Sequence, residues 1–388
     1  MLPYILNTVR SNANAFCNIS KCCECFLVHL LTVFSIITVK DITHGSDVLV
    51  KKLTDLGCSV YEDNTGEQIG GNAGNIYAVL EGSLEGSILF SSHMDRVANG
   101  FGIKPKCCGS RIVSDGTTIL AADDISGIAA ILDGLRRIKA SGSPHPRIEV
   151  LFTVCEEVLV TGSRYLDYSR FQSKIAFVLD SPGRIGRIIN GAPYKAQLIF
   201  EVKGQPSHAG NAPEKGINAV VASAKVLSRI RDGRLSPSST ANWASFEAKG
   251  PSNVVNAYAI VSGEVRSATS EELYAYVEEF RKVCADVAQE TGAEIIPQVN
   301  FNYEGFLIEE SRPSICLMKK VFEKMQIPVI IERGGGGMDA NRLNTNGIEA
   351  IGLATGYAQN HSSSEYIEKD DLIRSGEMVE NIILTREY

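Results

Sequence analysis

The sequence lacks any excess of positive charge. Its 388 residues contain 38 lysines and arginines against 45 aspartates and glutamates, which gives a net charge of −7. Because nucleic-acid binding needs a basic face, this balance argues against a nucleic-acid partner. Internal repeats and long low-complexity tracts are also lacking, whereas 44% hydrophobic and 21% charged residues are typical of a globular protein with a large core. At this length we expect two domains.

The sequence also lacks a clear membrane span. Residues 26–39 are mostly apolar, but they include His29, Thr32 and Ser35 and are fewer than the ~20 residues that cross a bilayer. The basic region before them is thin, and no small-residue cleavage site of a signal peptide stands out. We therefore expect a packed helix there rather than a membrane segment, and no membrane partner.

Disulfide patterns are lacking in spite of ten cysteines. Cys107 and Cys108 are adjacent, a spacing poorly suited to a bond between them. Four cysteines stand singly in apolar or helical surroundings and are interpreted as buried thiols: Cys58, Cys155, Cys284 and Cys316. This usage favours a reducing cytoplasm. Four more lie between residues 17 and 25, but no second cysteine or histidine pair completes a zinc-finger spacing there, so a structural metal is not favoured.

Five segments do carry side chains that bind metal ions. They are residues 91–95, 121–124, 155–157, 179–181 and 360–362. Together they offer two imidazoles and several carboxylates, with two glutamates side by side at 156–157. Zn²⁺ binds this mixture of nitrogen and oxygen ligands, and a hydrolytic site also needs a base that does not bind the metal. The ordered set therefore predicts a two-zinc hydrolase.

Short apolar runs come before four of these segments, at residues 87–90, 148–154, 175–179 and 350–354. Such runs are typical of strands buried on both faces of a mainly parallel sheet. Ligands that follow strand ends match the geometry of α/β folds. The acidic pair 123–124 instead opens a helix, and either aspartate suits its N-cap. We predict an α/β fold with a mixed, mainly parallel sheet and flanking helices.

The middle of the chain, residues 191–304, predicts an inserted domain. Its patterns follow the order β-α-β-β-α-β, which is the ferredoxin-like plan. The elements are expected at 195–202, 217–230, 240–246, 254–265, 270–291 and 293–303. The hydrolase domain is then split into residues 1–190 and 305–388. An independent unit between two halves of a site is a natural lid.

Taken together, these motifs resemble the peptidase T-like branch of the M20 (M20/M25/M40) metallopeptidases, which are two-zinc aminopeptidases and related amidohydrolases. The resemblance runs from about residue 53 to about residue 367. Its motifs are His93-Met94-Asp95, Ala122-Asp123-Asp124, Glu156-Glu157, Asp180, His208-Ala209-Gly210, residues 213–219, Asp339-Ala340-Asn341 and residues 361–365.

The resemblance implies which residues bind the metal ions. One zinc ion would be held by His93 and Asp180. The other would be held by Glu157 and His361, and Asp123 would bridge the two. The implied cofactors are two Zn²⁺ ions, with Co²⁺ or Mn²⁺ as substitutes.

The resemblance also implies catalytic roles in this domain. Glu156 would be the general base that takes a proton from a water between the two ions. Asp95 would accept the second ring N–H of His93 and hold the orientation of that ring.

In the predicted lid, His208 would donate to the oxyanion, often across a dimer interface in relatives. Arg266 and Asn253 match positions that hold substrate carboxylate or backbone, although a surface arginine at a strand end is an open alternative for Arg266. We expect a homodimer formed through the lid. A monomer whose lid closes by a hinge near Gly191 and Glu304 is the alternative.

We therefore expect a cytoplasmic zinc metallopeptidase that cleaves short peptides, as a tripeptide-type aminopeptidase. Two alternatives stay open: an amidohydrolase or carboxypeptidase of the same superfamily, and a catalytically silent binding protein that keeps the fold. The second is motivated by departures from the family pattern. Ile125 stands where relatives usually have lysine, Leu159 where they have glycine, and Met338 where they have serine or threonine.

Overall fold

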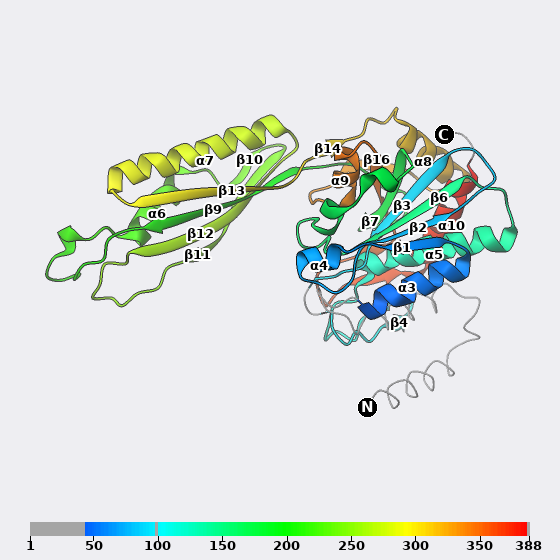
Figure 1. Ribbon diagram of the computed structural model, residues 1–388, viewed down its shortest axis with the longest axis horizontal. Coiled ribbons are helices and arrows are strands. Elements are labelled where there is room, and N and C mark those ends of the chain that lie inside the picture. Colours follow the sequence, from blue (N-terminus) through cyan, green and yellow to red (C-terminus); the bar gives the residue numbers. More distant parts are fainter. Residues whose placement is uncertain (1–42, 98–99, 386–388) are drawn as a thin grey trace. The chain divides into compact units, whose positions relative to one another are not determined.

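The computed structural model describes residues 43–97 and 100–385 (Figure 1). The helix predicted at 26–39 and the cysteines between 17 and 25 lie outside the described residues. In the part of the chain that is described, no helix has the length and hydrophobicity of a membrane span.

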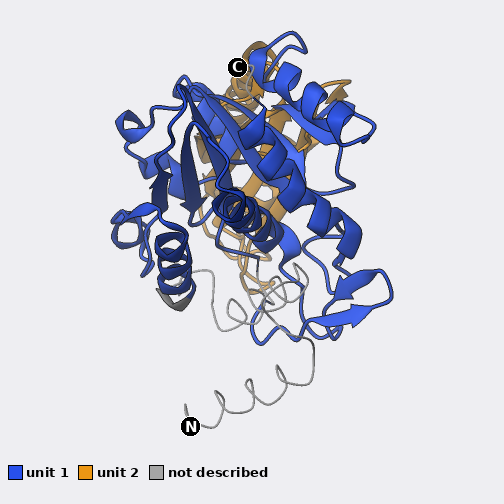
Figure 2. Cartoon of the chain, turned by 90° about the vertical axis from the view of Figure 1, so that its right-hand side faces the viewer, with its two compact units in different colours: residues 1–191, 307–333, 338–388 blue, residues 192–306, 334–337 orange. Residues whose placement is uncertain are grey.

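The chain divides into two compact units (Figure 2). The second unit contains Ala192–Phe306 and Gly334–Gly337, and the first contains the other described residues. From the sequence we expected the inserted domain at residues 191–304. The glycine run at 334–337 was expected in the other domain, but it belongs to the second unit. Each unit has its own hydrophobic core.

A nine-stranded sheet forms the centre of the first unit, in the order β1-β2-β6-β3-β7-β16-β8-β14, with β15 beside β8. The strands are β1 (Ser59–Glu62), β2 (Ile76–Leu80), β3 (Ser87–His93), β6 (Arg147–Thr153), β7 (Ile175–Ser181), β8 (Arg187–Ala192), β14 (Phe306–Leu307), β15 (Ile330–Arg333) and β16 (Glu349–Ala354). The central strands β6, β3, β7 and β16 are parallel. Strand β1 pairs antiparallel with β2, β2 with β6, and β8 with β16, whereas β15 pairs parallel with β8. The predicted mixed α/β sheet is confirmed.

Helices pack against this sheet. They are α3 (Thr43–Leu56), α4 (Thr65–Ile69), α5 (Ala122–Ser141), α8 (Pro313–Lys324), α9 (Asp339–Thr345) and α10 (Lys369–Leu384), with short 3₁₀ turns η1 (Gly162–Tyr165) and η2 (Tyr168–Arg170). Helix α5 contacts β3 and β7, and α10 packs along α5. Ile128, Ile131 and Leu135 of α5 are completely buried, as their helical spacing predicts.

A small antiparallel sheet was not expected from the sequence. Its order is β17 (Tyr357–Ala358), β18 (Tyr366–Glu368), β5 (Arg111–Val113) and β4 (Lys106–Cys108). Strands of two or three residues are too short to show an alternating pattern. The pairing of β18 with β5 joins parts of the chain that are far apart in sequence.

The second unit is a five-stranded antiparallel sheet in the order β10-β11-β12-β9-β13. Its elements are β9 (Tyr194–Lys203), η3 (Pro213–Lys215), α6 (Ala219–Arg229), β10 (Gly233–Ser236), β11 (Ser239–Glu247), β12 (Tyr258–Ser267), α7 (Ser270–Thr291) and β13 (Glu294–Tyr303). Helices α6 and α7 contact each other and the sheet (Figure 1). Phe200, Trp243 and Phe280 form an aromatic cluster in its core. The order β11-β12-β9-β13 is the predicted ferredoxin-like arrangement, and β10 is an additional edge strand.

Candidate metal centre

Several predicted ligands meet at one edge of the large sheet. His93 is the last residue of β3, Asp180 is in β7, and Glu156 and Glu157 lie three and four residues after the end of β6. Because β3 lies between β6 and β7 and is parallel to both, the carboxyl ends of these strands lie side by side. Strand geometry therefore brings four functional side chains together from three separate segments.

The first group of candidate ligands consists of His93, Asp123 and Asp180. His93 Nε2 lies 3.1 Å from Asp123 Oδ1 and 3.8 Å from Asp180 Oδ1. The His93 side chain is only 1% exposed, and the two carboxylates are 7% and 11% exposed. One nitrogen and two oxygens that converge in a buried place form a typical set of protein ligands for a divalent ion.

The second group consists of Asp123, Glu157 and His361. His361 Nε2 lies 2.9 Å from Glu157 Oε1 and 3.2 Å from Asp123 Oδ2. Asp123 therefore belongs to both groups and turns a different carboxylate oxygen to each. This geometry is suitable for a bridging carboxylate, and the two groups together contain the five predicted ligands.

The start of α5 differs from the prediction of a simple capped helix. Asp123 and Asp124 have backbone angles outside the helical range, and neither caps the helix with its side chain. The Asp124 carboxylate instead accepts a hydrogen bond from Ser92 Oγ in β3. It is completely buried. The prediction of an aspartate N-cap was wrong because these two residues turn toward β3 before the regular helix begins.

The carboxylate of Asp95 has a different partner from the one expected. His93 Nδ1 lies 3.0 Å from the main-chain carbonyl oxygen of Asp95, whereas the Asp95 carboxylate is 3.6 Å from that nitrogen. The backbone N–H groups of Glu156 and Glu157 donate to the two carboxylate oxygens of Asp95, over 2.9 and 3.1 Å. Asp95 thus orients His93 through its backbone and fixes the two glutamates through its side chain.

Glu156 is buried beside both groups, but among the described residues it is a member of neither. Burial raises the pKa of its carboxyl well above the usual value, and the nearby charge of Asp180 raises it further, against the opposing effect of His93. A carboxylate next to metal ligands that is not itself a ligand is free to exchange protons. This position suits the predicted general base.

The charges of this site fit a divalent cation. Burial and the nearby carboxylates also raise the pKa of Asp180 well above its usual value. Hydrogen bonds to Asp123 and Glu157 raise the pKa of His361 to about 10, so a proton of His361 neutralises the carboxylates around it. A metal ion between the same atoms would replace that proton, because it compensates the buried negative charge more strongly. The residues present therefore fit two ions, with three candidate protein ligands for each.

Sequence reasoning gave no role to four side chains around these ligands: Tyr357, Thr153, Asp339 and Glu365. Tyr357 Oη donates to Asp180 Oδ1 over 3.2 Å, and Thr153 Oγ1 donates to Asp339 Oδ2 over 2.5 Å. The buried Glu365 carboxylate accepts three backbone N–H groups at the start of α5. Burial raises the pKa of Glu365 to about 7, although these N–H groups act in the opposite direction. Only the family motifs that contain Asp339 and Glu365 could have drawn attention to them.

The predicted lid residues lie in the second unit. His208 is exposed, and its Nδ1 accepts hydrogen bonds from the backbone N–H groups of Gly210 and Asn211, both over 3.1 Å. A neutral ring that accepts at Nδ1 carries its proton on Nε2, so His208 presents a donor to the outside. Asn253 is exposed and its backbone carbonyl accepts from Ala209 N.

Arg266 is half-buried and already has partners. Its Nε donates to Glu264 over 2.7 Å, and its Nη1 donates to the Gly335 carbonyl over 2.9 Å. Lys195 Nζ lies 2.7 Å from the other carboxylate oxygen of Glu264. Arg266 is therefore fixed in this unit by ion pairing and is not a loose surface arginine. Its pKa is raised, because the pairing with Glu264 outweighs burial.

The departures from the family pattern differ in their local setting. Ile125 and Met338 are buried, 1% and 6% exposed, and Ile125 belongs to the hydrophobic core. Leu159 has φ of 63°, in the left-handed region where glycine is preferred. None of the three replaces a proposed ligand.

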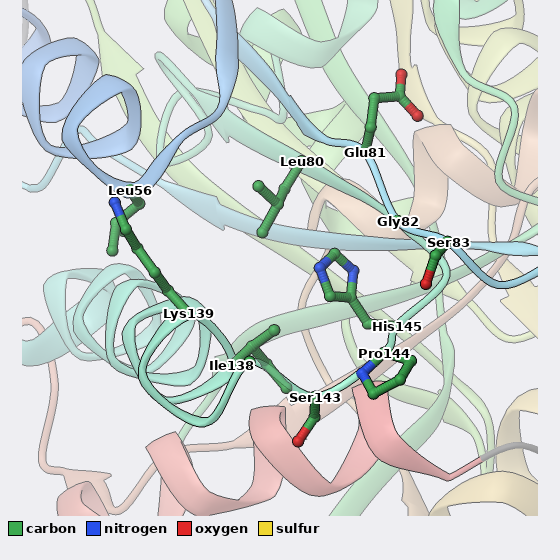
Figure 3. A pocket seen from close by; sticks show the side chains of 11 residues that line it. Leu56, Leu80, Glu81, Gly82, Ser83, Ile138, Lys139, Ser143, Pro144 and His145 are labelled. Atoms are coloured by element: carbon green, nitrogen blue, oxygen red, sulfur yellow. The ribbon is translucent and has the colours of Figure 1, made fainter.

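A cavity of about 400 Å³ lies elsewhere in the first unit (Figure 3). Leu56, Leu80 and Ile138 line it together with Lys139 and His145. It shares no residue with either candidate ligand group. The chemistry of the side chains, and not cavity size, therefore locates the candidate site.

Comparisons with known proteins agree with this geometry. The peptidase dimerisation domain of the M20 family matches residues 193–292, and peptidase family M28 matches residues 75–188. The uncharacterized protein YqjE of Bacillus subtilis is 35% identical over 337 residues, which are 87% of this chain and 91% of that protein.

Two solved structures are similar over nearly their whole length. A tripeptidase from Staphylococcus aureus has a TM-score of 0.88 and 28% identity, over 92% of this chain and 95% of that chain. The aminopeptidase PepT from Bacillus cereus has a TM-score of 0.87 and 36% identity, over 93% of this chain and 97% of that chain. With this identity and coverage, the chain belongs to the M20/M28 peptidases, in their peptidase T-like group.

Proposed function

We propose that this protein is a two-zinc aminopeptidase that acts on short peptides, with tripeptides as the preferred substrates. The observation that carries the proposal is the shared position of Asp123 between two ligand groups, with the buried Glu156 beside both and in neither. A protein that only binds metal or peptide has no need of an additional buried carboxylate at this place. The similarity to an aminopeptidase from Bacillus cereus and to a tripeptidase from Staphylococcus aureus supports short peptides as the substrate class.

His93, Asp123 and Asp180 would hold one ion, and Asp123, Glu157 and His361 the other. When bound, the two ions would polarise the scissile carbonyl and lower the pKa of the attacking water.

The residues of the chain supply the remaining steps. Glu156 accepts the proton of the attacking water and passes it to the amine of the leaving group. Burial raises the pKa of Glu156 above its usual value, which suits a group that both takes and releases a proton. The Asp95 carboxylate keeps Glu156 and Glu157 in place through their backbone N–H groups, so the base and a ligand are positioned together.

In the second unit, His208 would stabilise the negative oxygen of the tetrahedral intermediate with its Nε2–H. The two backbone N–H groups at Nδ1 support this assignment, because they favour the tautomer with the proton on Nε2. Arg266 and Asn253 would bind the carboxylate and backbone of the peptide. The dimerisation-domain match supports a homodimer through this unit, in which His208 serves the partner's active site.

The proposal is tested by metal analysis and by a panel of free and N-blocked di- and tripeptides. Glu156→Gln should keep both metal ions and lose about 10²–10⁴-fold in kcat, because only the base is removed. Its matched control, Glu157→Gln, carries the same change one residue further along and should lose metal as well. Cleavage of N-blocked peptides in preference to free ones would contradict an aminopeptidase, and unchanged kcat in Glu156→Gln would contradict the proposed base.

A further inference from the structure

The buried carboxylate of Glu365 holds the turn that presents Asp123. Its Oε2 accepts from the backbone N–H groups of Leu120 and Ala121, both over 2.8 Å, and its Oε1 accepts from that of Asp123 over 3.0 Å. The side chain is nearly inaccessible to water, since the residue is 1% exposed. Amides at the start of a helix have no partners within the helix, and only an ionised carboxylate can accept all of these without itself donating.

This turn could not be held by helical hydrogen bonding alone. Ala121 has φ of 58°, and Asp123 has φ of −81° with ψ of 102°, so the chain enters α5 through non-helical conformations. The N-cap residue is Ala121, and no side-chain hydrogen bond from it caps the helix. The anchor comes instead from a residue that is 242 positions away in sequence.

The segment that carries Glu365 also carries the second histidine ligand. Asn360 Nδ2 donates to Asp123 Oδ2 over 2.7 Å, and His361 Nε2 lies 3.2 Å from the same oxygen. Immediately after Glu365, strand β18 pairs with β5, and Ile367 of β18 is completely buried. Residues 360–365 therefore contact both the side chain and the backbone N–H of Asp123. Strand β18, which follows Glu365, holds the C-terminal end of this segment by pairing with β5.

We infer that Glu365 is a positioning residue that fixes Asp123 between the two ligand groups, so that both metal positions depend on it. The inference rests on the metal site of the proposed function and not on peptide cleavage. Because Asp123 belongs to both groups, displacing its backbone should weaken both positions and not only the one that contains His361. A residue that merely stabilised the fold would have no selective effect on metal binding.

The test is titration of metal-free protein with Co²⁺, followed by its visible absorption, for wild type, Glu365→Gln and Glu365→Asp. Gln would turn an N–H₂ group toward one of the backbone N–H donors, and Asp is too short to reach all three. We expect wild type to bind two Co²⁺ ions, Glu365→Gln to bind both about 10–100-fold more weakly, and Glu365→Asp to be intermediate. The matched control is Glu368→Gln, because Glu368 lies three residues further on and its exposed partners Ser110 and Arg111 are away from the ligands.

Amide hydrogen exchange of the metal-free proteins gives a second readout. Leu120, Ala121 and Asp123 should exchange faster in Glu365→Gln than in wild type and in Glu368→Gln, while the strands of the large sheet keep their protection. Unchanged Co²⁺ affinity at both positions in Glu365→Gln, or loss at one position alone, would overturn the inference, as would a wild type that binds fewer than two ions. Failure of the protein to cleave peptides would contradict the proposed function and leave these binding results standing.

Discussion

The loop after β6 carries Glu156 and Glu157 in a backbone conformation that few residues favour. Cys155, Leu159 and Val160 all have positive φ, between 53° and 63°. Left-handed conformations of this kind cost about 1–2 kcal/mol for residues with a Cβ. Such backbone strain is concentrated at functional sites, where the surrounding structure holds it in place. Here Asp95 supplies part of that support, through the N–H groups of Glu156 and Glu157.

Leu159 offers a direct test of this strain. We expect Leu159→Gly to change the free energy of unfolding by less than about 1 kcal/mol, because relief of the left-handed strain offsets the greater freedom of glycine in the unfolded chain. Leu159→Val should destabilise the protein by about 1–2 kcal/mol, because β-branched residues are the least tolerant of positive φ. Urea denaturation of the three proteins measures the difference. Equal stability of the Gly and Val variants would show that the loop relaxes and stores no strain.

At the level of elements, a buried glutamate joins β6 to its surroundings. Glu149 is completely buried, and its carboxylate accepts from the backbone N–H groups of Gln172 and Ser173, both over 3.0 Å. Tyr77 Oη donates to it over 2.8 Å, and Arg147 Nε lies 3.0 Å away. Burial opposes its ionisation, but the hydrogen bonds outweigh burial and lower the pKa of Glu149. The Glu149 carboxylate on β6 thus binds groups of β2 and of the segment that leads into β7.

Glu149 should make stability depend on pH. Its pKa is lower in the folded than in the unfolded state, so its contribution is present above the unfolded pKa of ~4.5 and is lost as the pH falls through the folded value. We expect Glu149→Gln to be about 2 kcal/mol less stable at pH 7, and to lose less stability than wild type between pH 5 and pH 3. Urea denaturation across this range measures both effects.

The control for this experiment is Glu81→Gln. Glu81 contacts the same Arg147, but its side chain is 70% exposed. Its removal should change stability by less than about 1 kcal/mol at any of these pH values. Parallel pH profiles for wild type and Glu149→Gln would contradict the assignment of the pH dependence to Glu149.

For the whole molecule, the cluster of buried carboxylates should make the stability of the fold depend on a bound metal ion. Asp123, Asp180 and Glu156 lie close together in the first unit, beside His93 and His361. We expect EDTA at pH 7 to lower the Tm by about 5 °C or more, and Zn²⁺ to restore it, because ligands of the folded state alone stabilise it. Thermal unfolding with metal analysis measures this effect. Asp123→Asn should lose the response, and an unchanged Tm of verified metal-free protein would contradict a bound cation.

A second prediction for the whole molecule concerns the dimer. If His208 acts in the partner's active site, His208→Ala and Glu156→Ala are each inactive, but mixed dimers contain one intact site. Random exchange makes half of the dimers mixed, so activity should return to roughly one quarter of wild type. Co-expression of the two variants, followed by peptide assays, measures the recovery. In a monomer, or in a dimer where His208 serves its own subunit, no activity returns.

The sequence by itself determined the fold class, the inserted unit and the set of candidate ligands. The apolar runs before His93, Glu156 and Asp180 predicted buried parallel strands, and neighbouring parallel strands necessarily place their carboxyl ends together. The alternating patterns of the inserted unit likewise predicted its sheet and two helices. These features follow from local periodicity and from the order of the motifs, so the sequence is sufficient to predict them.

Only the tertiary structure decided which atoms meet. Asp95 was predicted to orient His93 with its carboxylate, but that carboxylate instead accepts from the N–H groups of Glu156 and Glu157. This depends on the direction of the side chain, which the spacing of residues does not specify. The hold of Glu365 on the turn before Asp123 depends on strand β18, whose three residues show no readable pattern. Contacts between residues hundreds of positions apart are set by packing of the whole unit. The sequence therefore determined the candidate ligands of this site, and the tertiary structure decided how they are held.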